Sequence, residues 1–166
     1  MKKRIMASFV FALLLVSLSG CKVLSSLGLG GGPVEGEIGT KMTTEWFEFT
    51  VKSAEIVDSY ADYTASEGYK LLEVVVTEKN ISSDTLPMGT YDFLLDDPAD
   101  AAYYVSALDP LDDKMMPLDF DLKPGETVTY HLLFEVDAAS SGYKFLYTEY
   151  FTDESEGKTF IVDLGV

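Results

Sequence analysis

The sequence predicts an all-β domain: an immunoglobulin-like antiparallel β-sandwich of about seven strands, with a closed barrel as the alternative. Short runs alternate apolar with polar residues, turn-forming residues separate the runs, and no apolar stripe of helical period competes with them. The clearest run is Thr127–Val136, in which successive side chains fall on opposite faces of a strand. One face carries Val128, Tyr130, Leu132, Phe134 and Val136, and the other carries Thr127, Thr129, His131, Leu133 and Glu135. We expect the first face to line the core and the second to meet solvent.

The other strands are expected wherever similar apolar runs lie between turn signals. The turn at Leu122–Glu126 has a mechanism, since Pro124 presets φ and Gly125 tolerates a positive φ. A second turn is expected at Asn80–Asp84. The Cys, Trp, Cys pattern of antibody domains is absent, and a single cysteine allows no intrachain disulfide, so the core alone must stabilise the fold. The expected segments are Trp46–Val51, Tyr69–Thr77, Tyr91–Asp96, Tyr103–Val105, Met115–Leu122, Tyr143–Tyr147 and Thr159–Leu164.

Residues 1–20 have the three parts of a secretory signal peptide. A basic start, Lys2-Lys3-Arg4, precedes an apolar run from Ile5 to about Leu18, and small residues follow. As a helix, this run of roughly 14 residues would span about 21 Å, which is short of a hydrocarbon core of about 30 Å. We therefore expect a cleaved leader rather than a transmembrane anchor.

The leader ends in Leu18-Ser19-Gly20-Cys21, which resembles the lipobox of bacterial lipoproteins. The resemblance implies that a signal peptidase cleaves before Cys21 and that the Cys21 sulfur carries diacylglycerol. Two or three acyl chains hold a protein firmly, whereas a single chain binds a bilayer only marginally. We therefore expect Cys21 to be a lipid attachment site that holds the protein at the extracytoplasmic face of the cell membrane.

After Cys21 the chain is rich in glycine and lacks periodicity as far as about Thr44. This composition is typical of a flexible tether, whose reach over about 23 residues would be roughly 25 to 30 Å. The expected organisation is a signal peptide over 1–20, a lipidated cysteine and linker over 21–44, and the sandwich domain over 45–166.

The charge of the chain excludes some partners. The sequence has 12 basic and 28 acidic residues, and losing the three basic residues of the leader leaves a net charge of −19. Long-range repulsion opposes binding to nucleic acid or to an anionic lipid surface, so neither is an expected partner beyond the lipid anchor itself.

The residue types offer little for catalysis, so we expect no catalytic residue, no cofactor, no metal site and no enzymatic activity. A Ser-His-Asp arrangement would have to use His131, the only histidine, and no Gly-x-Ser-x-Gly turn is present. We expect His131 to be solvated on the outer face of its strand. One histidine and one lipidated cysteine do not supply a usual zinc site.

Carboxylates are the abundant reactive groups, and calcium is the alternative that they raise. Asp109–Lys114 lacks the ligand spacing and the central glycine of an EF-hand loop, so solvated acidic loops are the preferred interpretation. Tyrosine-rich clusters at Tyr60/Tyr63 and Tyr147/Tyr150/Phe151 suit either core packing or a contact surface. The carboxylates in question are Asp96, Asp97 and Asp100, then Asp109, Asp112 and Asp113, then Asp119 and Asp121.

Several segments together resemble a domain of unknown function that is common in lipoproteins of Gram-positive bacteria. The resemblance covers roughly residues 45–166 and implies an immunoglobulin-like (telokin-like) fold, related to that of a secreted mycobacterial antigen, with no catalytic residue. The matching features are Trp46-Phe47 with Phe49, the valine-rich run into Lys79-Asn80, Tyr91–Asp97, Leu122–Thr127, Leu133–Val136 and Phe160–Val162.

The function expected from these observations is a non-enzymatic binding or protein-interaction domain displayed outside the cytoplasmic membrane. The ligand is unknown, and an envelope protein or a glycan is the expected class of partner. The alternatives are an envelope spacer without a ligand, a calcium-dependent adhesion module that uses the acidic loops, and a hydrolase that uses a pair of carboxylates.

Overall fold

The computed structural model describes residues 32–99, 104–151 and 156–166, and in these residues the chain forms strands and one short 3-10 turn. The described part contains no helix of the length and apolarity that a membrane crossing needs. In chain order the elements are β1 (Val34–Glu37), β2 (Lys41–Thr43), β3 (Phe47–Val57), β4 (Ser59–Tyr60), β5 (Tyr63–Thr64), β6 (Tyr69–Asn80), β7 (Leu86–Met88), η1 (Thr90–Asp92), β8 (Phe93–Asp96), β9 (Tyr104–Ser106), β10 (Phe120–Leu122), β11 (Thr127–Asp137), β12 (Lys144–Tyr150) and β13 (Glu156–Asp163).

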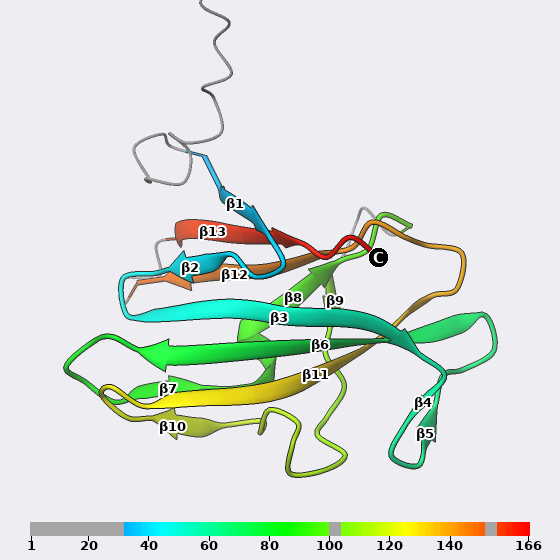
Figure 1. Ribbon diagram of the computed structural model, residues 1–166, viewed down its shortest axis with the longest axis horizontal. Helices are drawn as coiled ribbons and strands as arrows, with labels where there is room; N and C mark the ends of the chain where they lie inside the picture. Colours follow the sequence, from blue (N-terminus) through cyan, green and yellow to red (C-terminus); the bar gives the residue numbers. More distant parts are fainter. Residues whose placement is uncertain (1–31, 100–103, 152–155) are drawn as a thin grey trace, which may run out of the picture.

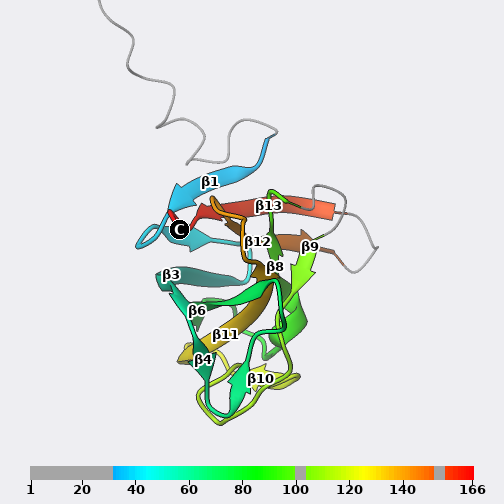
Figure 2. The same cartoon turned by 90° about the vertical axis from the view of Figure 1, so that its right-hand side faces the viewer.

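Two sheets pack face to face, which confirms the expected β-sandwich (Figures 1 and 2). One sheet has the order β1-β13-β12-β8-β9 and the other has the order β11-β6-β3-β2. Their strands pair antiparallel except β1 and β13, which are parallel. The β7–β10 ribbon lies beside β11, and the β4–β5 hairpin projects from one end of the molecule (Figure 1).

The expected start of the domain at residue 45 is too late. β1 pairs with β13 and β2 pairs with β3, so residues 34–43 belong to the sandwich. Glycines that read as a tether have structural roles here. Gly36 leaves room for Met42, which is 2 % exposed, and Gly39 makes the turn between β1 and β2 with φ of 87°. The linker therefore ends before β1, and the expected leader, Cys21 and residues 22–31 of the expected linker lie outside the described residues.

The inner faces of the sheets are as predicted. Val74, Leu132 and Phe134 are fully buried, and Leu132 and Phe134 lie opposite Val74 and Leu72 in the β11–β6 register. The turn before β11 also has the predicted geometry, because Gly125 has φ of 74°. At one end of the core, aromatic rings from both sheets pack edge to face or stack at centroid distances of 4.9–6.5 Å: Phe47, Phe49, Phe93, Phe145, Tyr147 and Phe160.

The outer face of β6 and β11 is covered, which corrects the expectation that it meets solvent. Leu71 and Leu133 are fully buried there, together with Met115, beneath the β4–β5 hairpin and the segment before β10. Hydrogen bonds fix this cover: the Tyr63 hydroxyl donates to Glu135 at 2.8 Å, and the Tyr60 hydroxyl donates to Asp112 at 3.2 Å. Tyr60 and Tyr63 are thus packing residues in this second, smaller core.

His131 lies on the outer face, as predicted, but it is half-buried rather than solvated. Its Nδ1 lies 2.6 Å from Glu73 Oε1, and its ring lies 6.3 Å from the Tyr60 ring. Its backbone N–H donates to the Lys114 carbonyl, so the segment before β10 attaches to the edge of β11 at this residue. His131 therefore helps to hold the outer cover.

Candidate binding site

The two halves of the segment Leu86–Asp96 pair with different strands. β8 pairs with β12 as far as Phe93 opposite Tyr147, whereas β7 pairs with β10. Between them the chain turns through η1, so Thr148–Tyr150 at the end of β12 pair only with β13 among the described strands. This divergence leaves a gap between β7 and the end of β12.

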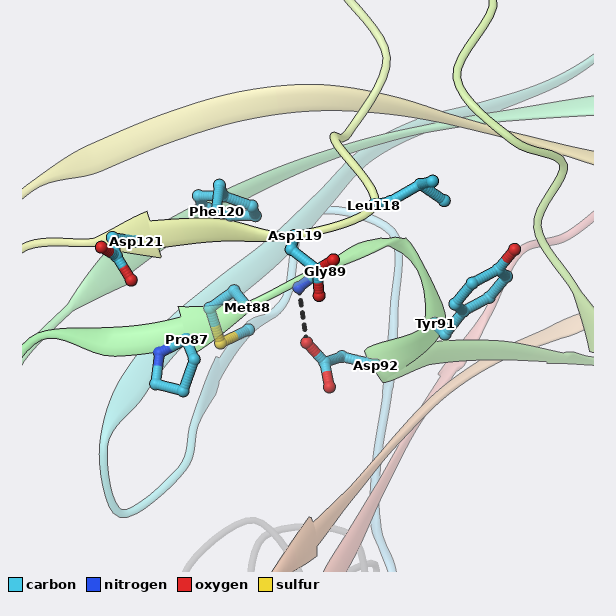
Figure 3. A pocket seen from close by; sticks show the side chains of 9 residues that line it. All are labelled: Pro87, Met88, Gly89, Tyr91, Asp92, Leu118, Asp119, Phe120 and Asp121. Carbon is cyan, nitrogen blue, oxygen red and sulfur yellow. Dashed lines mark hydrogen bonds between the residues drawn. The ribbon is translucent and has the colours of Figure 1, made fainter.

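The turn at Gly89–Asp92 is fixed by its own residues. The Thr90 hydroxyl donates to the Met116 carbonyl at 2.7 Å and lies 3.0 Å from the Pro117 carbonyl, and the Thr90 N–H also donates to Pro117. The Gly89 N–H donates to the Asp92 carboxylate at 2.7 Å (Figure 3). These bonds attach the turn to the segment before β10 and hold the Asp92 side chain at the divergence point.

The acidic hollow lies on one side of this turn. It has a volume of about 470 Å³ and contains three carboxylates, with no basic residue among those that line it. Asp121 and Tyr91 stand at opposite ends of the hollow in Figure 3, and the Tyr91 hydroxyl donates to Asp109 at 2.6 Å. The lining residues are Pro87, Met88, Gly89, Tyr91, Asp92, Leu118, Asp119, Phe120 and Asp121.

The aromatic hollow lies on the other side, in the gap between β7 and the end of β12. Its volume is about 350 Å³, and it shares Pro87, Met88 and Asp92 with the acidic hollow. Tyr150, one of the residues that line it, is 63 % exposed. The lining residues are Trp46, Phe47, Leu86, Pro87, Met88, Asp92, Tyr147, Thr148 and Tyr150.

One buried carboxyl group, that of Glu78, is influenced by the charge of Asp92, which lines both hollows. Glu78 is on the inner face of β6, has no exposed surface, and neither of its side-chain oxygens has a hydrogen-bond partner within the part of the chain that the structure describes. Burial, and secondarily the charge of Asp92, raises the pKa of Glu78 to about 8. Burial also raises the pKa of Tyr147, with further contributions from the charges of Asp92, Glu149 and Glu78. The charges of Glu78 and Asp92 thus disfavour each other, and the raised pKa favours the protonated form of Glu78 at neutral pH.

The acidic stretches noted in the sequence do not converge on one site. Asp119 and Asp121 line the acidic hollow, while Asp109 accepts a bond from Tyr91. Asp112 accepts bonds from Tyr60 and from the N–H groups of Lys114 and Met115. Within residues 32–99, 104–151 and 156–166, no three His, Cys, Asp or Glu side chains are grouped so as to hold a metal ion. Asp97 is buried and accepts the Ala99 N–H, and Asp100 lies outside the described residues.

Sequence reasoning missed Glu78, Asp92 and Trp46 as members of the site. The signal for Glu78 was present, because Leu72, Val74 and Val76 share one face of β6 and residue 78 is the next position on that face. An acid at an inward position of an otherwise apolar strand is worth noting. The expected strand ended at Thr77 and so left Glu78 out.

Comparison with known proteins identifies the family. A family model described as "Domain of unknown function (DUF4352)" matches residues 36–158. That match begins within the expected tether, as does the sandwich itself. No curated protein is a significant match to the chain.

Solved structures share the fold at low identity. A secreted protein from Mycobacterium tuberculosis, MPT63, aligns with a TM-score of 0.59 at 13% identity over 81% of this chain and 99% of its own. A Bacillus subtilis protein, ycdA, described as a "putative lipoprotein", aligns with a TM-score of 0.58 at 24% identity over 76% of this chain. The alignment spans only 39% of the Bacillus chain. A Staphylococcus aureus protein of the same description gives 0.51 at 13% identity over 77% of this chain and 90% of its own. At these identities the similarity shows the fold alone.

Proposed function

The chain belongs to the DUF4352 family, a domain of unknown function, and from this premise we propose that it is a lipoprotein whose sandwich domain binds a partner outside the cytoplasmic membrane. In this proposal the lipid on Cys21 attaches the chain to the membrane. The signal peptide and the lipobox pattern of the sequence support the anchor, as do fold neighbours described as lipoproteins.

The observation that carries the binding role is the divergence of β7 from β8 at Gly89–Asp92. It opens two hollows around one turn, and among the described strands none pairs with the end of β12 on that side. Hollows that combine apolar walls with a few placed polar groups are the usual form of a binding site. Exposed Tyr150 and half-buried Trp46 supply the aromatic contact area that protein interfaces favour.

The role is proposed as non-enzymatic because of the residues at the site. The hollows hold carboxylates and aromatic rings, while His131, the only histidine, lies beneath the hairpin on the outer face of the other sheet. An envelope protein is the partner class that these aromatic and carboxylate surfaces suit.

Site-specific photocross-linking in the producing cells tests the proposal. A benzophenone amino acid at Tyr150 should give a discrete cross-linked species. The matched control is Tyr69, which is 53 % exposed but lies at the opposite end of β6 from Glu78, about 30 Å away at ~3.3 Å per strand residue. Cross-linking at Tyr150 and not at Tyr69 supports binding at the hollows. Equal cross-linking at both positions, or none at either, would favour an envelope spacer instead.

A further inference from the structure

The β4–β5 hairpin, which projects from one end of the molecule, is attached to the sandwich by side chains (Figure 1). Each of its strands has two residues, and a hairpin of this size is marginally stable at best by itself. Ala61 in its turn has φ of 49°, a left-handed conformation that a residue with a Cβ seldom adopts. Among the described residues, the hydrogen bonds from Ser59–Thr64 to the rest of the chain start at the Tyr60 and Tyr63 hydroxyls, and both end on carboxylates.

Glu135 of β11 holds one side of the hairpin. Its carboxylate accepts the Ser66 N–H at 2.5 Å and the Tyr63 hydroxyl at 2.8 Å. These bonds, that of the Ser66 N–H foremost, lower the pKa of Glu135 because they stabilise its charged form. A hydrogen bond to a charged acceptor is about twice as strong as one to a neutral acceptor. Protonation of Glu135 therefore weakens both bonds.

Asp112, in the segment before β10, holds the other side. Its carboxylate accepts the Tyr60 hydroxyl at 3.2 Å. Burial acts to raise the pKa of Asp112, but bonds from the N–H groups of Lys114 and Met115 and from the Tyr60 hydroxyl outweigh burial and lower it. The segment itself is bonded to the backbone of His131, and those bonds do not titrate. Protonation of Asp112 therefore weakens the hold on the hairpin while backbone bonds still hold the segment.

Titratable groups from each neighbouring element surround the hairpin. They are Tyr60 from β4, Tyr63 from β5, Glu73 from β6 with Glu55 beside it on β3, Asp112 and Lys114 from the segment before β10, and His131 and Glu135 from β11. Acid leaves the two bases positive and makes the carboxylates neutral. It thus removes the charged acceptors of the hairpin and supplies no new one.

The direction of the pH effect follows from the lowered pKa values. The stabilisation that Glu135 and Asp112 give to the closed hairpin is fully present above their ordinary pKa values of 4.5 and 3.8, and it is lost as pH falls below them. The main core is not weakened in the same way, because Glu78 is protonated in acid and the self-repulsion of the acidic chain decreases. Acid should therefore act on the hairpin first.

We propose that the β4–β5 hairpin is an acid-released cover, which opens when Glu135 and Asp112 are protonated and exposes Leu71, Leu133 and Met115. These three residues form the small core beneath the hairpin, and none of them is more than 2 % exposed when it is closed. The inference concerns a conformational change and does not depend on the proposed function of the hollows.

Met115 and Met116 are a matched pair for the test, because these adjacent residues are buried in different cores. The full-length chain in mild detergent is treated with dilute hydrogen peroxide, and mass spectrometry of fragments measures methionine sulfoxide at each position. Oxidation of Met115 should be about tenfold faster at about pH 3 than at about pH 6, because each unit by which a pKa is lowered changes the equilibrium tenfold. Met116 should change less than about twofold. Equal acceleration at both positions, or at neither, would overturn the inference.

Two variants assign the release to the carboxylates. Glu135→Gln keeps an acceptor oxygen but removes the charge, so at about pH 6 Met115 should be oxidised about fivefold faster and the response to acid should be smaller. Tyr60→Phe removes the bond to Asp112, keeps the bonds within the segment and should act in the same direction. Glu55→Gln, at an exposed position of β3, should match the wild type within about twofold. A full response to acid in Glu135→Gln/Tyr60→Phe, or equal effects of Glu135→Gln and Glu55→Gln, would also overturn it.

Discussion

The α-carbon of Gly89 packs directly against the carbonyl oxygen of Leu118, and a Cβ at Gly89 would overlap that oxygen. Gly89 has an extended backbone with φ of −171°, so glycine is needed here for space and not for conformation. The contact joins the divergence point of β7 and β8 to the segment before β10. It also forms part of the wall of the acidic hollow.

Gly89→Ala should therefore lower the free energy of unfolding by about 3 kcal/mol, because backbone must move to admit the methyl group. The control is Gly32→Ala, since a Cβ at Gly32 meets nothing within 4 Å, and its cost should stay within about 0.5 kcal/mol. Denaturant melts of both variants provide the comparison. Equal stabilities would mean that the segment before β10 is not held against Gly89.

A pair of substitutions in β11 tests the packing of both faces of that strand. Phe134 is fully buried, so Phe134→Ala should cost about 3 to 5 kcal/mol. The sequence alone predicts a cost within roughly 0.5 kcal/mol for His131→Ala. The contact with Glu73 and the packing beneath Tyr60 raise the expected cost to about 1 kcal/mol. Denaturant melts that rank the two substitutions in the opposite order would contradict the register of β11.

The alternation of apolar and polar residues predicted the strands in which it is unbroken. Strand β11 was expected over Thr127–Val136 and extends over Thr127–Asp137, because its period-two pattern is unbroken. Met115–Leu122 was expected as a strand, but only Phe120–Leu122 is part of one. At the start of that segment the Met116 N–H donates to the His131 carbonyl, and the His131 N–H donates to the carbonyl of Lys114 just before the segment. These bonds join residues distant in sequence, so no local pattern reveals them.

The candidate site was predictable only in part, for a related reason. Asp119 and Asp121 were among the carboxylates noted in the sequence. The hollow that they line, however, exists because β7 diverges from β8 at Gly89–Asp92. That divergence depends on tertiary bonds from Thr90 to Met116 and Pro117. In the same way, Gly36 and Gly39 read as a tether until the packing of Met42 and the pairing of β1 with β13 are known.

Glu78 should make stability depend on pH. Its pKa is about 8 in the folded chain and near its ordinary value of 4.5 when unfolded, so the folded state retains a proton that the unfolded state releases. The associated stability is fully present below about pH 4.5 and is lost as pH rises towards 8. Between about pH 5 and pH 8 the wild-type chain should lose on the order of 3 kcal/mol that Glu78→Gln retains.

The difference between the two proteins is the quantity to measure, by denaturant melts across this pH range, because self-repulsion of the acidic chain affects both alike. Glu55→Gln serves as the control and should follow the wild-type curve. Parallel curves for Glu78→Gln and the wild type would show that Glu78 does not carry a buried proton.

The lipid anchor is tested at Cys21. Cys21→Ala should abolish labelling by a fatty acid analogue and should leave an unprocessed precursor or release the protein into the medium, because no other cysteine can accept the lipid. Metabolic labelling followed by fractionation of membranes and medium measures both effects. Labelling that persists in the variant would contradict the lipoprotein assignment.

Divalent cations should stabilise the domain without preference for one ion. With a net charge of −19 on the mature chain, salt screens self-repulsion, so calcium and magnesium at matched ionic strength should raise the melting temperature slightly and equally. Asp109 accepts a bond from the Tyr91 hydroxyl, and Asp112 accepts one from the Tyr60 hydroxyl.

A calcium site would behave differently, because a ligand that binds only the folded state adds about 2.7 kcal/mol at a hundredfold excess over its Kd. Thermal melts with each ion, repeated on Asp109→Asn/Asp113→Asn and on Asp119→Asn/Asp121→Asn, separate the loop from the acidic hollow. Asp112 is left intact because it accepts the N–H groups of Lys114 and Met115, so its loss would destabilise the loop by itself. A saturable shift of several degrees with calcium alone, removed by either pair of substitutions, would show a specific site and replace the screening account with calcium-dependent binding.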